Sequence, residues 1–206
     1  MRKYVAEFIG TFFLALVVAL SLAISPPLAT PVLAALTLGI FVYTVGHISG
    51  THINPAVTIG IFTLGKIKPA EAVGYVVAQF LGGAAAFVLA FSVLALPAPA
   101  AGEASAAVFL AETMGMLLFT FGIASAVYGK APAGLSGVVV GSSLLLGIVV
   151  AVGMGSGGIL NPAVALALNS LNVAYVGGHI AGSLLGFQLY RLVSGDSGPA
   201  SGSKKK

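Results

Sequence analysis

The chain has 206 residues, of which 58% are hydrophobic and only 7% are charged, whereas a soluble domain carries about 25% charged residues. This composition argues against a freely soluble enzyme and a disordered chain. The net charge of +4 does not indicate nucleic-acid binding, because the basic residues form no stripe interleaved with aromatic residues. The absence of cysteine excludes a disulfide framework and a thiolate metal site. High apolarity with 28 glycines indicates helices packed closely in lipid.

Six apolar segments are long enough to cross a bilayer, which requires about 20 apolar residues per helix. They lie near residues 4–24, 31–48, 69–95, 106–128, 133–152 and 173–193. Two further apolar segments, 54–64 and 161–170, are too short to cross and are predicted to re-enter the membrane from one side. The sequence therefore predicts an all-α membrane protein with six transmembrane helices and two re-entrant half-helices.

The basic residues predict how the chain is oriented. With six crossings, all nine Lys and Arg residues fall on one side, and the connections on the other side, 25–31, 97–105 and 153–160, contain none. The positive-inside rule then predicts a multi-pass protein of the cell (inner) membrane with both termini in the cytoplasm.

Two stretches of the chain recur in its second half. Ile53–Val57 returns as Leu160–Val164, and Ala6–Gly10 is matched by Ala111–Gly115. Each half then contains three crossings and one short segment. Because three is odd, the second half must be inverted relative to the first.

The repeat also divides the chain. We expect residues 1–98 and 99–193 to form the two inverted repeats, followed by a cytoplasmic tail over 194–206. The two short segments would enter from opposite faces and meet near the middle of the membrane.

Each repeated motif predicts the start of a helix inside the membrane. Asn is a preferred N-cap and Pro is favoured in the first turn, so Asn54-Pro55-Ala56 and Asn161-Pro162-Ala163 should each begin a half-helix. We expect each Asn oxygen to accept a backbone N–H and each amide NH₂ to point outward as a donor. Two such ends would hold a passing water by its oxygen, interrupt proton relay and repel cations. The motifs thus predict the central constriction of a channel for small neutral molecules.

Five stretches carry a family resemblance: Ala6–Thr11, Gly46–Gly50, His52–Thr58, Ala78–Gly83 and Asn161–Ala163. Together they resemble the major intrinsic protein family, the aquaporins and glycerol facilitators, over about residues 3–193. The resemblance implies six helices and two half-helices around one pore per subunit, in a homotetramer embedded in the lipid bilayer. The implied function is a passive channel for water and/or small neutral solutes.

The predicted selectivity filter departs from the family pattern. The family's second motif usually continues with Arg, and Val164 stands at that position. Ungapped spacing places Ala34, Val149 and Gly158 at the other filter positions. This set has no large ring, no charge and no side-chain donor. We therefore expect a wide apolar constriction with looser selectivity toward glycerol, urea, ammonia or hydrogen peroxide.

Glu7 and Glu112 are ionisable groups inside predicted helices, where they are costly and usually functional. One interpretation is that they support the half-helices by accepting hydrogen bonds from the backbone of the re-entrant loops. The alternative is that they carry protons in a secondary transporter built on the same repeat.

The three histidines of the chain are further candidate functional residues. His47 and His52 flank the first motif and are predicted pore-loop residues, with no carboxylate pair near enough to suggest a metal site. His179 occupies the position that matches Gln79 and is either a satisfied buried histidine or a pH sensor. In the second case, His179→Ala should remove any change of activity between pH 5 and 8.

The sequence contains no Ser/His/Asp set, paired His-Glu metal motif or Gly-rich phosphate loop, so we expect no enzyme activity and no cofactor or metal. A closed structural junction protein remains as a further alternative to a channel.

Overall fold

The computed structural model describes residues 1–195, and these residues form helices and connections without any strand. The Lys204–Lys206 cluster and most of the predicted cytoplasmic tail lie outside the described residues. The six long helices are α1 (Arg2–Ile24), α2 (Thr30–Ser49), α4 (Pro69–Phe87), α5 (Ala106–Val127), α6 (Ser136–Gly153) and α8 (Val173–Ser194). The predicted class, an all-α protein with six long helices and two short ones, is confirmed.

The two short helices are α3 (Pro55–Thr63) and α7 (Pro162–Ala167). Helix α7 ends earlier than the predicted segment 161–170, because Asn169 takes a left-handed conformation with φ 55° that an α-helix does not accommodate. The predicted third span continues beyond α4 as one stretch of π-helix, η1 (Val88–Val93).

Most of the long helices have the composition of membrane spans. Five of them, α1, α2, α4 with η1, α5 and α6, are long and apolar enough to cross a membrane by length and composition. Helix α8 has a similar length of 22 residues but carries His179, Gln188 and Arg191. The large apolar side chains that the long helices expose, such as Leu36, Val77 and Leu146, suit contact with lipid.

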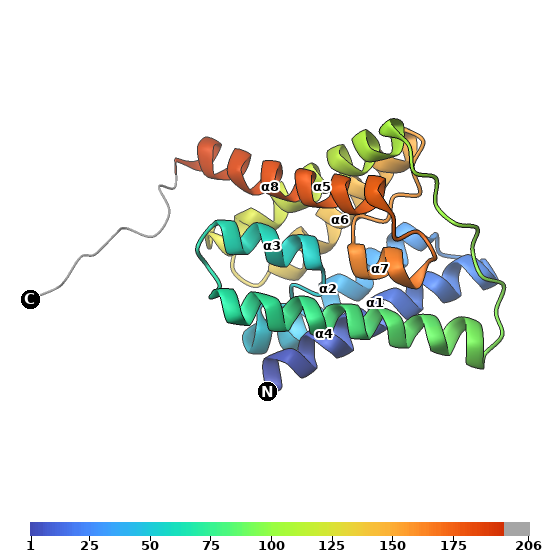
Figure 1. Cartoon of the computed structure of the whole chain (residues 1–206). Coiled ribbons are helices and arrows are strands. Elements are labelled where there is room, and N and C mark those ends of the chain that lie inside the picture. Colours follow the sequence, from blue (N-terminus) through green and yellow to red (C-terminus); the bar gives the residue numbers. More distant parts are fainter. Residues whose placement is uncertain (196–206) are drawn as a thin grey trace, which may run out of the picture.

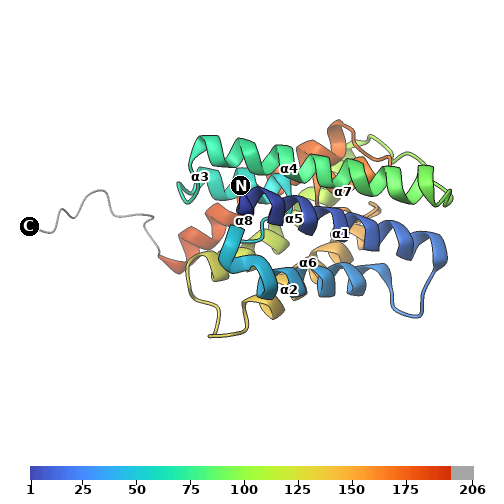
Figure 2. The ribbon, with the colours of Figure 1, turned by 90° about the horizontal axis from the view of Figure 1, so that it is seen from below.

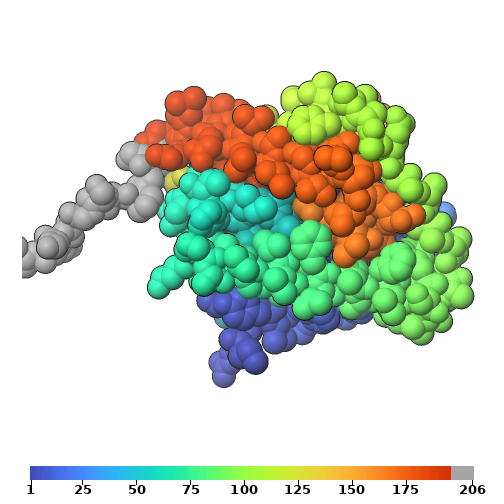
Figure 3. Space-filling model, viewed as in Figure 1, coloured from blue at the N-terminus to red at the C-terminus, as the bar shows by residue number. Residues whose placement is uncertain are grey.

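The long helices run side by side, and the short helices lie between them (Figures 1 and 2). The first residue and the end of α8 lie at the same end of the bundle, which we call the terminus end (Figure 1). Helix α3 runs from the middle of the bundle toward the terminus end, and α7 runs from the middle toward the far end (Figure 1). The space-filling view shows α8 and α4 on either side of the two short helices (Figure 3).

Packing follows the repeat. Helix α1 packs on α2 and α4, and α5 packs on α6 and α8, whereas each short helix packs on a long helix of the other half, α3 on α8 and α7 on α4. Glycines allow these close approaches. A β-carbon at Gly82 would overlap the carbonyl oxygen of Phe8, one at Gly182 that of Thr113, and one at Gly83 that of Ala163. Small residues at such crossings are typical of helices packed in lipid.

Candidate pore and its paired helix caps

The two repeated motifs begin α3 and α7 as helix caps. The side-chain oxygen of Asn54 accepts hydrogen bonds from the backbone N–H groups of Ala56 (2.9 Å) and Val57 (3.4 Å). That of Asn161 accepts from Ala163 (3.0 Å) and Val164 (3.4 Å). Pro55 and Pro162 occupy the first helical positions, where no N–H is needed.

The amide groups of the two caps reach across to the opposite motif. Nδ2 of Asn54 donates to the carbonyl oxygen of Leu160 at 2.8 Å, and Nδ2 of Asn161 donates to that of Ile53 at 2.9 Å. Ile53 and Leu160 have left-handed φ values of 36° and 52°, so these carbonyls are turned toward the other half. Each amide has two hydrogens, so one binds the partner motif and one remains for a ligand. Sequence reasoning expected both hydrogens to point outward and missed this exchange.

A cavity of about 320 Å³ lies against the two caps, and its wall is mostly apolar. Both asparagines line it, and so do three of the four predicted filter residues, Ala34, Gly158 and Val164.

The fourth predicted filter residue, Val149, does not line this cavity; its side chain is 55% exposed on the outer face of α6. Its neighbour Ile148 lines the cavity instead. This assignment is therefore corrected by one residue. Successive helical positions differ by about 100°, so a slip of one residue moves a side chain off the pore.

A second cavity, of about 600 Å³, lies toward the terminus end and has a more polar wall. His47 lines this cavity and is exposed, whereas His52 is buried and lines both cavities. Lys66 and Glu71 also contribute to its wall. The two predicted pore-loop histidines thus both border this second cavity.

The loop before α3 is held by Glu7. Its carboxylate accepts four hydrogen bonds, from Ser49 Oγ (2.7 Å), Gln79 Nε2 (2.7 Å) and the backbone N–H groups of His52 (2.9 Å) and Ile53 (2.6 Å). Glu7 is fully buried. Four donors match the four lone-pair sites of an ionised carboxylate.

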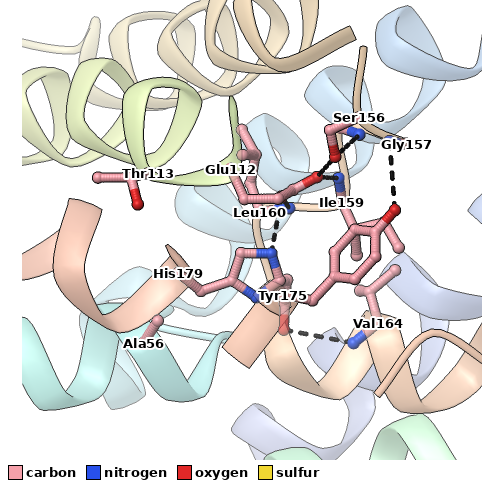
Figure 4. A network of polar contacts seen from close by, with 12 residues as sticks. Ala56, Glu112, Thr113, Ser156, Gly157, Ile159, Leu160, Val164, Tyr175 and His179 are labelled. Atoms are coloured by element: carbon pink, nitrogen blue, oxygen red, sulfur yellow. Dashed lines mark hydrogen bonds and ion pairs between the residues drawn. The ribbon is translucent and has the colours of Figure 1, made fainter. Parts of the chain in front are cut away.

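Glu112 holds the loop before α7 in the same way (Figure 4). It accepts hydrogen bonds from Ser156 Oγ and from the backbone N–H groups of Ile159 (3.1 Å) and Leu160 (2.9 Å). The fourth contact is His179 Nε2, at 2.7 Å. Figure 4 shows the imidazole directed at the carboxylate from the side opposite Ser156.

These contacts bear on the two interpretations of the glutamates. Neither Glu7 nor Glu112 lines either cavity, and both carboxylates are occupied by donors from the loops. This arrangement fits half-helix support and offers no accessible group to a proton carrier. His179 is fully buried, and within residues 1–195 its Nε2 contacts Glu112 while its Nδ1 has no hydrogen-bond partner, so the first of its two predicted roles, a satisfied buried histidine, holds for Nε2 alone. Its pH-sensing role stays a prediction.

Sequence reasoning missed several residues that position the loops. Tyr75 donates from its hydroxyl to Ser49 O (2.8 Å), and Ser183 donates from Oγ to Ala56 O (2.7 Å). The repeat carried a signal for some of them, because Ser49 and Ser156 stand at matching distances before the two Asn-Pro pairs.

Comparison with known proteins agrees with this geometry. Residues 1–107 match the family model described as "Major intrinsic protein". Aquaporin Z of Rhodopseudomonas palustris is 31% identical over 94% of this chain and 89% of that protein. Aquaporin AqpM of Methanothermobacter thermautotrophicus is 32% identical over 79% of this chain and 80% of its own length. A glycerol uptake facilitator protein-like 6 of Lactiplantibacillus plantarum is 36% identical over 79% and 81%.

The fold is also similar to a solved structure. The aquaglyceroporin from Plasmodium falciparum superposes with a TM-score of 0.71 at 17% identity, covering 95% of this chain and 96% of the other. Sequence and fold therefore agree: the chain belongs to the major intrinsic protein family and is a passive membrane channel.

Proposed function

We propose that the channel carries water and small neutral solutes through one conduit per subunit, past Asn54 and Asn161. The observation that carries the proposal is the pair of caps, whose amide groups bind the opposite motif beside a cavity with a mostly apolar wall. Each cap keeps one amide hydrogen for a passing oxygen atom, and the positive ends of α3 and α7 meet there. A cation would meet donors and positive dipole ends, whereas a neutral solute would meet a hydrogen-bond partner.

The filter of the proposed pore consists of Ala34, Ile148, Gly158 and Val164. None of these side chains has a hydrogen-bond donor or a charge, so this filter would not select permeants by hydrogen bonding or by charge. Glycerol, urea, ammonia and hydrogen peroxide are suitable permeants besides water. The names of the relatives include both aquaporins and a glycerol uptake facilitator.

The proposal also covers assembly and orientation. The protein would form a homotetramer in the cell membrane, with both termini and the tail 194–206 in the cytoplasm and with 1–98 and 99–193 as its inverted repeats. Lys66 and Lys130 lie in connections on the same side of the bundle as Arg2 and Lys3, as the positive-inside rule requires.

The filter is tested by Val164→Arg in proteoliposomes. Stopped-flow light scattering would measure water, urea and glycerol flux, with empty liposomes as the baseline. The guanidinium would narrow the pore, so we expect urea and glycerol flux to fall by about tenfold. Val164→Met lengthens the side chain without adding charge, so it separates the effect of side-chain size on solute flux from the effect of charge. Unchanged solute flux in both variants would contradict the assignment of Val164 to the pore.

The charge barrier is tested by the double variant Asn54→Asp with Asn161→Asp. Asp can still cap a helix, but it brings negative charge and no amide donor, so we expect cation leakage in a flux assay. Asn172 offers a matched control, because it caps α8 and donates Nδ2 to Gly102 O (2.9 Å) away from the conduit. Equal leakage from Asn172→Asp would show that the effect does not depend on charge placed at the conduit.

A further inference from the structure

The two cavities meet on the terminus side of the caps. Three residues line both of them: Leu38 on α2, His52 in the first re-entrant loop and Phe119 on α5. Leu38 and Phe119 are each only 2% exposed, and His52 is 8% exposed, although all three border open space. A permeant must therefore pass between these side chains to move from one cavity to the other.

Phe119 breaks the symmetry of the repeat at this point. It stands two helical turns after Glu112, just as Leu14 stands two turns after Glu7. Leu14 lines only the cavity toward the far end, whereas the larger Phe119 reaches both. The two sides of the caps therefore differ at this position, with an aromatic ring bordering the cavity on the terminus side and an aliphatic side chain bordering only the other cavity. The filter residues Ala34, Gly158 and Val164 are all smaller than this ring.

The boundary is held in place by contacts that do not depend on a permeant. His52 Nδ1 lies 3.1 Å from Thr58 Oγ1, and its ring meets the ring of Tyr75 edge to face at 5.0 Å between centroids. The backbone N–H of His52 donates to Glu7 at 2.9 Å. Leu38 and Phe119 belong to the main hydrophobic core. Close-packed side chains of this kind yield little to a passing molecule.

We propose that Leu38, His52 and Phe119 form the size-selecting constriction of this channel, and that Phe119 sets the largest solute that passes. The inference rests on the proposed function, because it assumes that permeants follow the conduit between the two cavities. It places size selection on the terminus side of the caps and not at the apolar filter. The solutes admitted are those narrow enough to pass the ring in single file.

The test is the size limit of Phe119→Leu and Phe119→Ala in proteoliposomes. The solute series would be urea, glycerol and the linear four- and five-carbon polyols. Phe119→Leu copies Leu14 and keeps a core side chain, so it remains informative if Phe119→Ala does not fold. We expect the flux of the largest solute that wild type passes to rise about tenfold, and the next larger polyol to become permeant.

Two further variants decide between the constriction and the filter. Leu144→Ala is the control, because Leu144 lines only the cavity toward the far end, and it should leave the size limit unchanged. Ile148→Ala enlarges the filter and should also leave the limit unchanged. If Ile148→Ala raises the limit and the Phe119 variants do not, the inference is overturned. If folded wild type passes neither water nor urea, the proposed function fails instead.

Discussion

The two re-entrant loops reach the same geometry with different partners. In both, a buried glutamate takes two backbone N–H groups and a serine hydroxyl. The fourth donor differs: it is Gln79 in the first half and His179 in the second. The serine and backbone contacts of the glutamate are thus the same in both halves. Among the four contacts of each carboxylate, only the one made by Gln79 or His179 differs.

The two halves also differ in the side chains that contact Gln79 and His179. Thr58 Oγ1 connects Gln79 Nε2 (2.9 Å) with His52 Nδ1 (3.1 Å). At the matching positions of the second half stand Ala165 and Ile159, which offer no side-chain hydrogen bond. The series of hydrogen-bonded side chains therefore ends at His179, whose Nδ1 has no partner among the residues that the structure describes. The first loop is also the more buried, because Ser156 and Gly157 of the second loop are partly or fully exposed.

The largest effects are expected from Glu7→Ala and Glu112→Ala. Removing Glu7 takes the shared acceptor from four donors, and each buried donor left unsatisfied costs about 1–3 kcal/mol of the free energy of unfolding. Glu112→Ala should cost less, because water can reach the exposed part of its loop. Thermal unfolding in detergent, followed by circular dichroism, would measure both.

Glu71→Ala is the control for these variants. Glu71 pairs with Lys3 at 2.6 Å, with side chains 26% and 34% exposed, and such surface pairs contribute about 0–1 kcal/mol. Equal losses for Glu7→Ala and Glu112→Ala would contradict the argument from solvent access.

Substitutions at the matching positions Thr58 and Ala165 test the side-chain hydrogen bonds next to Gln79 and His179. Thr58→Ala should lower the free energy of unfolding by about 1–3 kcal/mol, because it leaves His52 Nδ1 unsatisfied. Ala165→Thr should raise it by about 1 kcal/mol if its hydroxyl reaches His179 Nδ1 as Thr58 reaches Gln79. Ala167→Thr places the same hydroxyl elsewhere on α7 and should only destabilise. A loss in Ala165→Thr as large as in Ala167→Thr would show that the two halves are not equivalent here.

The smallest effects are expected at the paired tyrosines. Tyr75 donates to Ser49 O at 2.8 Å, whereas the hydroxyl of Tyr175 accepts a long hydrogen bond, 3.3 Å, from the N–H of Gly157. We expect Tyr75→Phe to cost about 1 kcal/mol and Tyr175→Phe less than about 0.5 kcal/mol. The same unfolding assay applies, and a reversed order would contradict this assignment of the two hydroxyls.

The sequence predicted those features that local chemistry determines. Asn is a preferred helix cap and Pro is favoured at the first helical position, so both half-helices could be placed within a few residues. Val149 was misplaced, because counting back from Asn161 assumes a loop of fixed length between α6 and α7, and a one-residue error rotates the side chain away from the pore. The hydrogen bonds that the Asn54 and Asn161 amides donate to the opposite motif depend on how the two halves pack together. The local sequence of either half does not determine this packing.

Because of these two crossed hydrogen bonds, each half supplies a donor that the other half lacks. The turned carbonyls of Ile53 and Leu160 are completed only by an asparagine from the opposite repeat, so the first repeat emerging from the ribosome has an unfinished loop in its interior. The lumen can take its final form only after the last helices have been inserted. A single repeat expressed alone would therefore lack the asparagine that binds its own turned carbonyl.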